Sequence, residues 1–351
     1  MIVFLNTLSQ FRSRFLCVLL IVFSAFGALA QAAENQETDS HANADHKEFK
    51  PSEVILHHVL DDHIWHFWDG HYGTLYLPVI VYSSEKGFDV FSSRNFYNDH
   101  HEVVPYNGYK LDHNHIYLAD SGKAVFDLSI TKNVAMLFIN AALLLFIFLG
   151  VAKAYRQNTG KAPKGIQSFI EPIILFVRDE VVKPNIGHHY EKYMPYLLTL
   201  FFFILFGNIL GLLPGAANLT GNIAVTMTLA VITFIITNVN GNKSYWSHIF
   251  WTPGVPLPLR IVILPVEIVG IFTKPISLMI RLFVAITAGH IVILSLISLT
   301  FIFGSIYVGV ASSVVVLFIN LIEILVAAIQ AYVFTLFTAL YIGMSTAEDH
   351  H

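Results

Sequence analysis

A few residues in the second half of the chain have side chains that can hold a charge or exchange a proton. Between Tyr193 and Ala347 the charged residues are Lys243, Arg260, Glu267, Lys274, Arg281 and Glu323. His290 and Gln330 add two polar side chains to the same apolar stretches. A charged side chain at the centre of a bilayer costs about 2.5–3.5 kcal/mol, so such residues usually face a polar path or a partner. These residues therefore predict the transfer of ions across a membrane.

The spacing of these residues predicts two polar layers. The two apolar tracts on either side of Gly304–Ser305 form an antiparallel hairpin, in which residues equally far from the turn lie at one depth. His290 is then level with Glu323, and Arg281 is level with Gln330. The layers are about 10–13 Å apart at 1.5 Å per residue, and we expect the His290 layer to be nearer the outer surface.

The two layers predict different chemistry. An adjacent imidazole and carboxylate, such as His290 and Glu323, can pass a proton near neutral pH. The guanidinium of Arg281 keeps its proton, because the pKa of a guanidinium is above about 12. It therefore forms a fixed positive barrier that a proton passes only on a mobile carboxylate of a partner. The alternative is structural: Arg281 makes an internal salt bridge with Glu323 or with Glu267, which falls on the cytoplasmic side.

Composition places these residues in a membrane protein. The 351 residues are 55% hydrophobic and 13% charged, with a mean hydropathy of +0.62, whereas soluble domains carry about 25% charged residues. The formal net charge of -4 gives no basic field for nucleic acid. The single cysteine, Cys17, cannot form an internal disulfide. We expect a protein of the lipid bilayer, without nucleic acid as a partner.

The apolar pattern predicts an all-α polytopic membrane protein with about five transmembrane helices plus an interfacial helix, ending in a long tilted antiparallel helix hairpin. The expected spans are Val134–Val151, Pro195–Leu213, Ile223–Val239, Leu257–Phe303 and Tyr307–Met344, and the interfacial helix is Ile166–Val182. The basic residues of 153–192 and Lys243 predict cytoplasmic loops. The N-terminal part is then outside, and the tail 347–351 is cytoplasmic.

The first part of the chain reads as a secretory signal followed by a small polar domain. Two arginines precede an apolar core of about 14 residues, Phe15–Ala28, and small residues follow it. We expect a cleavable signal peptide over residues 1–32, with a first transmembrane helix as the alternative. Residues 33–132 then form a periplasmic domain with short strands, for example along Thr74–Tyr82.

This periplasmic domain holds most of the 17 histidines of the chain. A cluster such as His57, His58 and His63 can bind zinc or copper, and a periplasmic metal-binding module is one alternative function. The histidines have no fixed ligand spacing, so we favour a solvated His-rich domain and expect neither a metal nor a cofactor.

Several ordered motifs resemble one family. Thr273–Phe283 (TKPISLMIRLF), followed by Ala288-Gly289-His290, resembles the arginine helix of subunit a of the F-type ATP synthase, the stator subunit of the membrane Fo motor. Glu323 with Gln330–Phe334 (QAYVF) resembles the last helix of that family. The motifs NILGLLP at 208–214 and TGNIAVT at 220–226 resemble the two preceding helices. The resemblance makes residues 133–346 a transmembrane subunit a domain.

The resemblance implies roles for the polar residues. Arg281 would be the essential charge that faces the rotating c-ring. His290 and Glu323 would line the periplasmic half-channel, with Gln330 near the arginine and Glu267 toward the cytoplasmic exit. The chain would be a non-catalytic subunit whose two offset half-channels load and unload the c-ring carboxylates, which couples proton flow to ATP synthesis.

The resemblance also implies partners and a location. The partners would be c-ring subunits, b-type peripheral stalk subunits and, indirectly, the F1 sector, in the inner membrane of a bacterium. The chain has no Gly-rich phosphate loop, so nucleotide chemistry would belong to partner subunits.

One position departs from the family pattern. Many members have Gly-Asn where this chain has Val284-Ala285, so another polar group must line the path. Asn208, Asn222 and Asn320 remain open for this role, and Ser277 is a further polar residue of the arginine helix.

Two unrelated function classes remain as alternatives. A secondary ion transporter or channel often has internal repeats, and none is evident between residues 134–239 and 257–344. A haem-binding cytochrome needs paired histidines within its spans, whereas His290 alone lies deep in an apolar tract. The pairing of His290 with Glu323 favours protons over sodium as the transported ion.

Overall fold

The computed structural model describes residues 61–66, 73–83, 85–98, 103–112, 115–119, 121–157, 162–213, 215–251 and 256–347. The chain divides into two compact units, Met1–Lys50 and Pro51–His351, and every described residue belongs to the second. The predicted signal peptide, Cys17 and most of the predicted tail lie outside the described residues.

Short antiparallel strands form the N-terminal domain, as the sequence predicted. The strand β1 (Ile64–His66) pairs with β2 (Thr74–Tyr76), and β5 (Tyr109–Asp112) pairs with β6 (His115–Leu118). A three-stranded sheet has the order β4 (Gly87–Ser92), β3 (Pro78–Ser83) and β7 (Phe126–Asp127). A short 3-10 helix, η1 (Ser93–Phe96), follows β4.

The strand β3 shows why this sheet forms. Val79 and Val81 are fully buried, whereas Tyr82, on the opposite face of this central strand, is about half exposed. This period of two puts the branched side chains of one face into the domain core. Phe96 and Tyr109 complete that core from η1 and β5.

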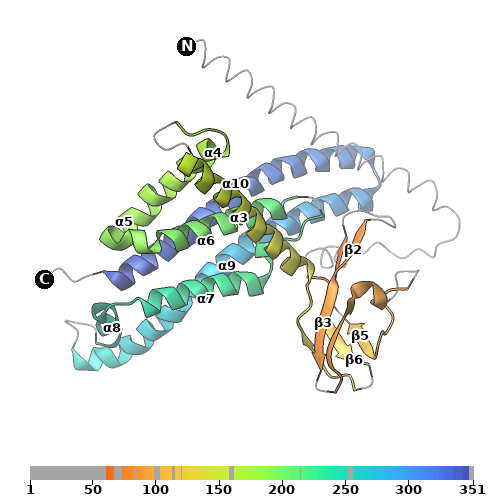
Figure 1. The fold of residues 1–351 in the computed structure, drawn as a ribbon, viewed down its shortest axis with the longest axis horizontal. Helices are drawn as coiled ribbons and strands as arrows, with labels where there is room; N and C mark the ends of the chain where they lie inside the picture. Colours follow the sequence, from red (N-terminus) through yellow and green to blue (C-terminus); the bar gives the residue numbers. More distant parts are fainter. Residues whose placement is uncertain are drawn as a thin grey trace, which may run out of the picture. The chain divides into compact units, whose positions relative to one another are not determined.

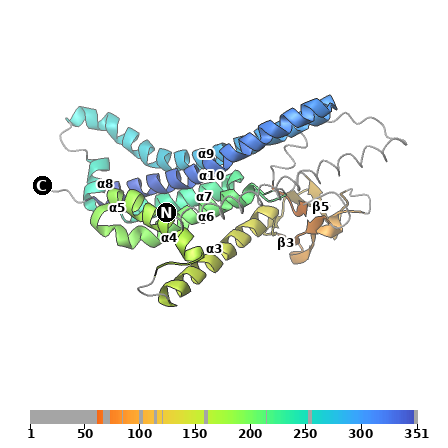
Figure 2. The same cartoon turned by 90° about the horizontal axis from the view of Figure 1, so that it is seen from above.

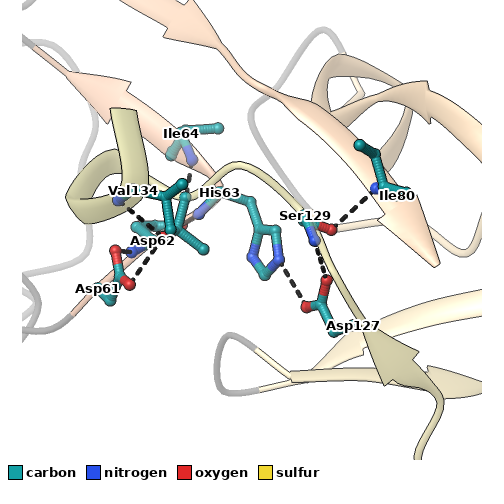
Figure 3. Close-up of polar contacts among 9 residues, drawn as sticks. Asp61, Asp62, His63, Ile64, Ile80, Asp127, Ser129 and Val134 are labelled. Carbon is teal, nitrogen blue, oxygen red and sulfur yellow. Dashed lines mark hydrogen bonds and ion pairs between the residues drawn. The ribbon is translucent and has the colours of Figure 1, made fainter. Parts of the chain in front are cut away.

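A buried histidine directly before β1 contacts the last strand, β7 (Figure 3). The Nε2 of His63 lies 3.0 Å from Oδ2 of Asp127, and Asp127 also accepts from the backbone N–H of Ser129. Burial raises the pKa of the Asp127 carboxyl, but the hydrogen bonds from His63 and Ser129 outweigh it and hold that pKa below its usual value of 3.8. The carboxylate therefore stabilises the domain above pH 3.8, and this contribution is lost as the pH falls through its lowered pKa.

Helices form the rest of the second unit (Figure 1). They are α3 (Lys132–Gln157), α4 (Ile166–Phe176), α5 (Lys183–Ile186), α6 (Tyr190–Gly211), α7 (Ile223–Val239), α8 (Lys243–Phe250), α9 (Leu257–Phe303) and α10 (Ile306–Thr346). A π-helical turn, η2 (Val177–Val182), joins α4 to α5, and the 3-10 turns η3 (Gly187–His189) and η4 (Leu219–Gly221) precede α6 and α7.

Among the described residues, four helical segments are long and apolar enough to cross a membrane. They are Lys132–Gln157, Ile166–Gly211, Ile263–Phe303 and Ile306–Thr346. A fifth is formed if α7 and α8, which meet at an angle of 101°, are one broken span. The predicted all-α membrane fold is confirmed, and the predicted bounds of α7 and α9 agree with the structure. The position of Ile166–Val182 at the membrane surface stays a prediction.

The predicted hairpin is formed by α9 and α10, which lie side by side (Figures 1 and 2). Gly304 ends α9 in the left-handed conformation, with φ 53°, which glycine adopts without steric cost. Figure 2 shows α9 bent along its length. Pro265 and Pro275 lie inside this helix and lack the N–H of a regular helical hydrogen bond.

We predict that Asp127→Ala destabilises the N-terminal domain, because it leaves the buried ring of His63 without its acceptor. The expected loss is about 1–3 kcal/mol in the free energy of unfolding. Limited proteolysis of the full chain in membranes should show faster cleavage within residues 61–131.

The matched control is Glu85→Gln, which removes the exposed ion pair with Lys123 at 3.5 Å. Exposed pairs contribute little to stability, so its cleavage rate should equal that of the wild type. Equal rates for D127A and the wild type would contradict the structural role of this pair.

Candidate functional site

His290 lies between α10 and the end of α6. Its Nδ1 is 2.6 Å from Oε1 of Glu323, and its Nε2 is 3.1 Å from the carbonyl oxygen of Gly211. Glu323 is 3% exposed and the side chain of His290 is 18% exposed. Three helices thus contribute one group each to a largely buried site that can exchange a proton.

The carbonyl of Gly211 decides which ring nitrogen of His290 holds a fixed proton. A carbonyl oxygen only accepts, so Nε2 donates its N–H to Gly211. Nδ1 then faces Glu323, where it either accepts from a protonated carboxyl or, in the imidazolium, donates to the carboxylate. The exchangeable proton therefore moves across one short hydrogen bond, while the far side of the ring stays anchored.

A glycine makes room for this contact. A Cβ added at Gly289 would lie 2.7 Å from Oε1 and 3.1 Å from Cδ of Glu323. The other carboxylate oxygen, Oε2, is buried and has no hydrogen-bond partner among the described residues. Burial of an unpaired polar oxygen is unfavourable, so Oε2 is available for a further donor.

A second polar group lies beside the same turn of α10. The amide nitrogen of Asn208 donates to the carbonyl of Ala327 at 3.3 Å, and the hydroxyl of Thr220 donates to Oδ1 of Asn208 at 2.6 Å. Asn208 and Thr220 are almost completely buried. Because Ala327 is one helical turn after Glu323, this network brings an amide from α6 next to the buried carboxylate's helix.

Arg281 lies nine residues before His290 on α9, which is about 13 Å along the helix. The guanidinium carbon is 4.4 Å from the centroid of the Phe337 ring on α10. Such a cation–π contact stabilises a positive charge without neutralising it. Within the described part of the chain, no carboxylate oxygen lies within 4 Å of Arg281, so the alternative salt bridge with Glu323 or Glu267 is not formed.

The structure gives Arg281 a contact that the equal-depth rule did not predict. The rule places Gln330 beside the arginine, but the guanidinium packs on Phe337, which is about two turns further along α10. Gln330 is partly buried and forms no hydrogen bond with Arg281 in the described residues. The long arginine side chain points toward the N-terminus of α9 and so reaches a ring further along the antiparallel α10.

A small pocket with a mainly apolar surface lies on the other side of Arg281, between α7, α8, α9 and α10, and some polar residues line it. Its polar lining is Thr233, Thr237, Asn238, Tyr245, Lys274 and Tyr341. Thr233 is linked to Tyr196 at 3.0 Å and to Thr338 at 3.4 Å, which extends the polar group to α6 and α10. The bundle therefore holds two polar regions, and Arg281 lies between them.

The remaining predicted site residues lie apart from these contacts. Asn222 caps α7 by accepting from the backbone N–H of Ala224 at 2.8 Å. Asn320 is partly buried on α10, and Ser277 is exposed on α9. Glu267 is partly buried on α9, about four turns before Arg281.

Sequence reasoning missed several buried polar groups. Asn140 on α3 is fully buried, with its amide nitrogen donating to the carbonyl of Phe203 at 3.0 Å. The threonines 226, 233 and 237 are buried on one side of α7. Their spacing at multiples of a helical turn was a usable signal, whereas the isolated Asn140 gave none.

The histidine cluster of the N-terminal domain is only partly described. His57 and His58 lie outside the described residues. Among those described, no group of three or more histidine, cysteine, aspartate or glutamate residues is placed to hold a metal ion.

Comparison with known proteins identifies the helical part of the chain. The family model described as ATP synthase A chain matches residues 134–343. A second family model, described as Domain of unknown function (DUF8433), matches residues 54–137. The two models meet at the first residues of α3.

Curated relatives extend the similarity over both regions. ATP synthase subunit a 2 of Chlorobium luteolum is 42% identical over 337 residues, which cover 93% of this chain and 86% of that protein. ATP synthase subunit a of Chloroherpeton thalassium is 47% identical over 232 residues, which cover 64% of this chain and 69% of that protein. The chain therefore belongs to the ATP synthase subunit a family, as the motifs around Arg281 and His290 indicated.

Proposed function

We propose that this chain is the proton-translocating stator subunit of an Fo motor, in which two offset half-channels load and unload the carboxylates of a rotating c-ring. The observation that carries the proposal is the Arg281 guanidinium, which packs on Phe337 and has no carboxylate of the described chain within 4 Å. A partly buried cation without a counterion among the described residues has its attraction available for a carboxylate on a partner.

The outer half-channel uses His290 and Glu323. Their short hydrogen bond lets a proton that arrives at one group leave from the other. Many family members have an asparagine on the arginine helix where this chain has Ala285. We propose that Asn208 supplies the missing amide from α6. Its support is the contact with Ala327, one turn from Glu323.

The inner half-channel follows the polar side chains of Thr237, Lys274 and Tyr341, which line the small pocket, and leads toward Glu267. A proton cannot pass directly from the outer region to this pocket, because Arg281 lies between them and keeps its own proton. A c-ring carboxylate must therefore carry it, ionised beside Arg281 and neutral elsewhere. This alternation couples proton flow to rotation and thus to ATP synthesis on other subunits.

We propose that the N-terminal domain is periplasmic and the C-terminus cytoplasmic, in a bacterial inner membrane. The basic residues of 153–192 and Lys243 support this orientation. The contacts at the two ends of the helical bundle are consistent with it. The N-terminal domain contacts one end through Trp65 and Gly215, and the C-terminal helix contacts Asn242 at the other end through Ser345. The proposed neighbours are the c-ring, b-type peripheral stalk subunits and, indirectly, the F1 sector.

We predict that Arg281→Ala abolishes ATP-driven proton pumping and proton-driven ATP synthesis, because the ring carboxylate loses the charge that keeps it ionised. Both activities should be measured in inverted membrane vesicles that contain the assembled complex. Coupled pumping by R281A would refute the proposed function.

Arg260→Ala is the matched control for this prediction. Arg260 is on the same helix and also packs on an aromatic ring, with its guanidinium carbon 4.1 Å from the centroid of Trp251. It lies near the start of α9, away from both polar regions, so R260A should retain pumping. Equal loss of pumping in R281A and R260A would mean that the effect of R281A is not specific to its position between the polar regions.

We predict that Gly289→Ala lowers proton flux, because the new Cβ displaces Oε1 of Glu323 from the ring of His290. Loss of one such hydrogen bond corresponds to about a 2- to 10-fold lower rate. The measurement is passive proton flux through membranes stripped of F1.

Gly270→Ala is the control for the added methyl group, because a Cβ at Gly270 of the same helix meets nothing within 4 Å. Its flux should equal that of the wild type. If G289A also conducts like the wild type, the contact between His290 and Glu323 does not limit proton transfer.

A further inference from the structure

The N-terminal domain contacts the segment that leads from α6 to α7. The indole Nε1 of Trp65 donates to the carbonyl of Gly215 at 2.6 Å. Trp65 is 6% exposed and packs with Leu77, Met136 and Ala217 in one apolar cluster. We call the described residues 215–222 the outer loop. Trp65 of strand β1 contacts this loop both by a hydrogen bond and by apolar packing.

The outer loop is joined closely to the end of α6. The backbone N–H of Ala216 donates to the carbonyl of Leu213 at 3.0 Å, and that of Leu213 donates to Leu210 at 3.1 Å. These tight turns connect Gly215 to the last turn of α6, which contains Gly211. A shift of the loop would therefore move the carbonyl that accepts from His290.

The other end of the outer loop touches the same site. Thr220 is fully buried and donates to Asn208, and the turn η4 packs against α6, α7 and α9. The loop is thus linked to both polar groups near Glu323. It reaches His290 through the neighbouring Gly211, and it reaches Asn208 through Thr220.

Trp65 itself is held firmly. Its strand continues from Asp61, whose carboxylate accepts from the backbone N–H of Asn133 at 3.2 Å and from the hydroxyl of Thr131 at 2.8 Å. His63, two residues before Trp65, is buried and bonded to Asp127. The tryptophan is therefore anchored both to the start of α3 and to the β3–β7 sheet.

We propose that Trp65 is a positioning residue for the outer half-channel: it holds the outer loop in the place that presents the Gly211 carbonyl to His290. This assigns a role to the N-terminal domain, and it rests on the function proposed above. The domain contributes no proton-transferring side chain to the site. It acts through the position of Gly211, whose carbonyl fixes which ring nitrogen of His290 stays hydrogen-bonded.

The test is Trp65→Phe, which keeps an aromatic ring but removes the N–H that bonds Gly215. Passive proton flux through F1-stripped membranes is measured across a pH series and divided by the amount of assembled complex. We expect flux to fall about 2- to 10-fold, with a changed pH profile, because His290 loses the acceptor that fixes its tautomer. Phe88→Leu is the control, since Phe88 is 62% exposed on β4 of the same domain; it should match the wild type.

Leu77→Ala provides a second route to the same loop, because it removes apolar contact from the cluster and leaves the indole N–H in place. If W65F fails to assemble, the L77A variant tests the proposal in its place. A changed pH profile of proton flux in L77A supports the proposal. An unchanged pH profile in every assembled variant, with flux that follows only the amount of complex, overturns it.

The Arg281→Ala variant separates this inference from the proposed function. If R281A still pumps, the proposed function is wrong. If R281A is inactive while W65F and L77A behave like the wild type, only the role of Trp65 is wrong.

Discussion

The structure depends on the cost of placing an ionisable group in hydrocarbon. Such a group needs a partner, because no solvent stabilises its charge. His290 and Glu323 satisfy each other across 2.6 Å. Arg281 has only the face of Phe337 in the described chain, and an aromatic ring does not neutralise a guanidinium. This positive charge is the feature on which the proposed function beside a mobile carboxylate rests.

Small residues allow the helices to satisfy the acid and the imidazole. Gly289 leaves space for the Glu323 carboxylate between α9 and α10. Gly211 ends α6 at the point where its carbonyl reaches the far side of the His290 ring. The site thus consists of one side chain from each hairpin helix and a backbone group from a third helix. A backbone acceptor cannot titrate, so it holds the ring without competing for the proton.

Within the second unit, hydrogen bonds connect the N-terminal domain to the helical bundle. Asp61 bonds the start of α3, His63 bonds the sheet, and Trp65 bonds the outer loop. The five-residue stretch Asp61–Trp65 therefore connects three elements that are far apart in sequence. The domain thus contacts the bundle near Gly211, and this location is the basis of the role proposed for Trp65.

The sequence by itself determined the class of protein, the helices and the polar residues on which the site depends. Long apolar tracts with few charges can only be helices in a bilayer, so the bounds of α7 and α9 followed from hydropathy, and the nearness of His290 to Glu323 followed from the antiparallel hairpin. Tertiary structure alone decided that Arg281 packs on Phe337, because a long arginine side chain can reach a ring several residues away from its own level. It also decided the contacts of Trp65 with Gly215 and of His290 with Gly211. Backbone carbonyls carry no sequence signature, so a bond to one of them is visible only when the chain is folded.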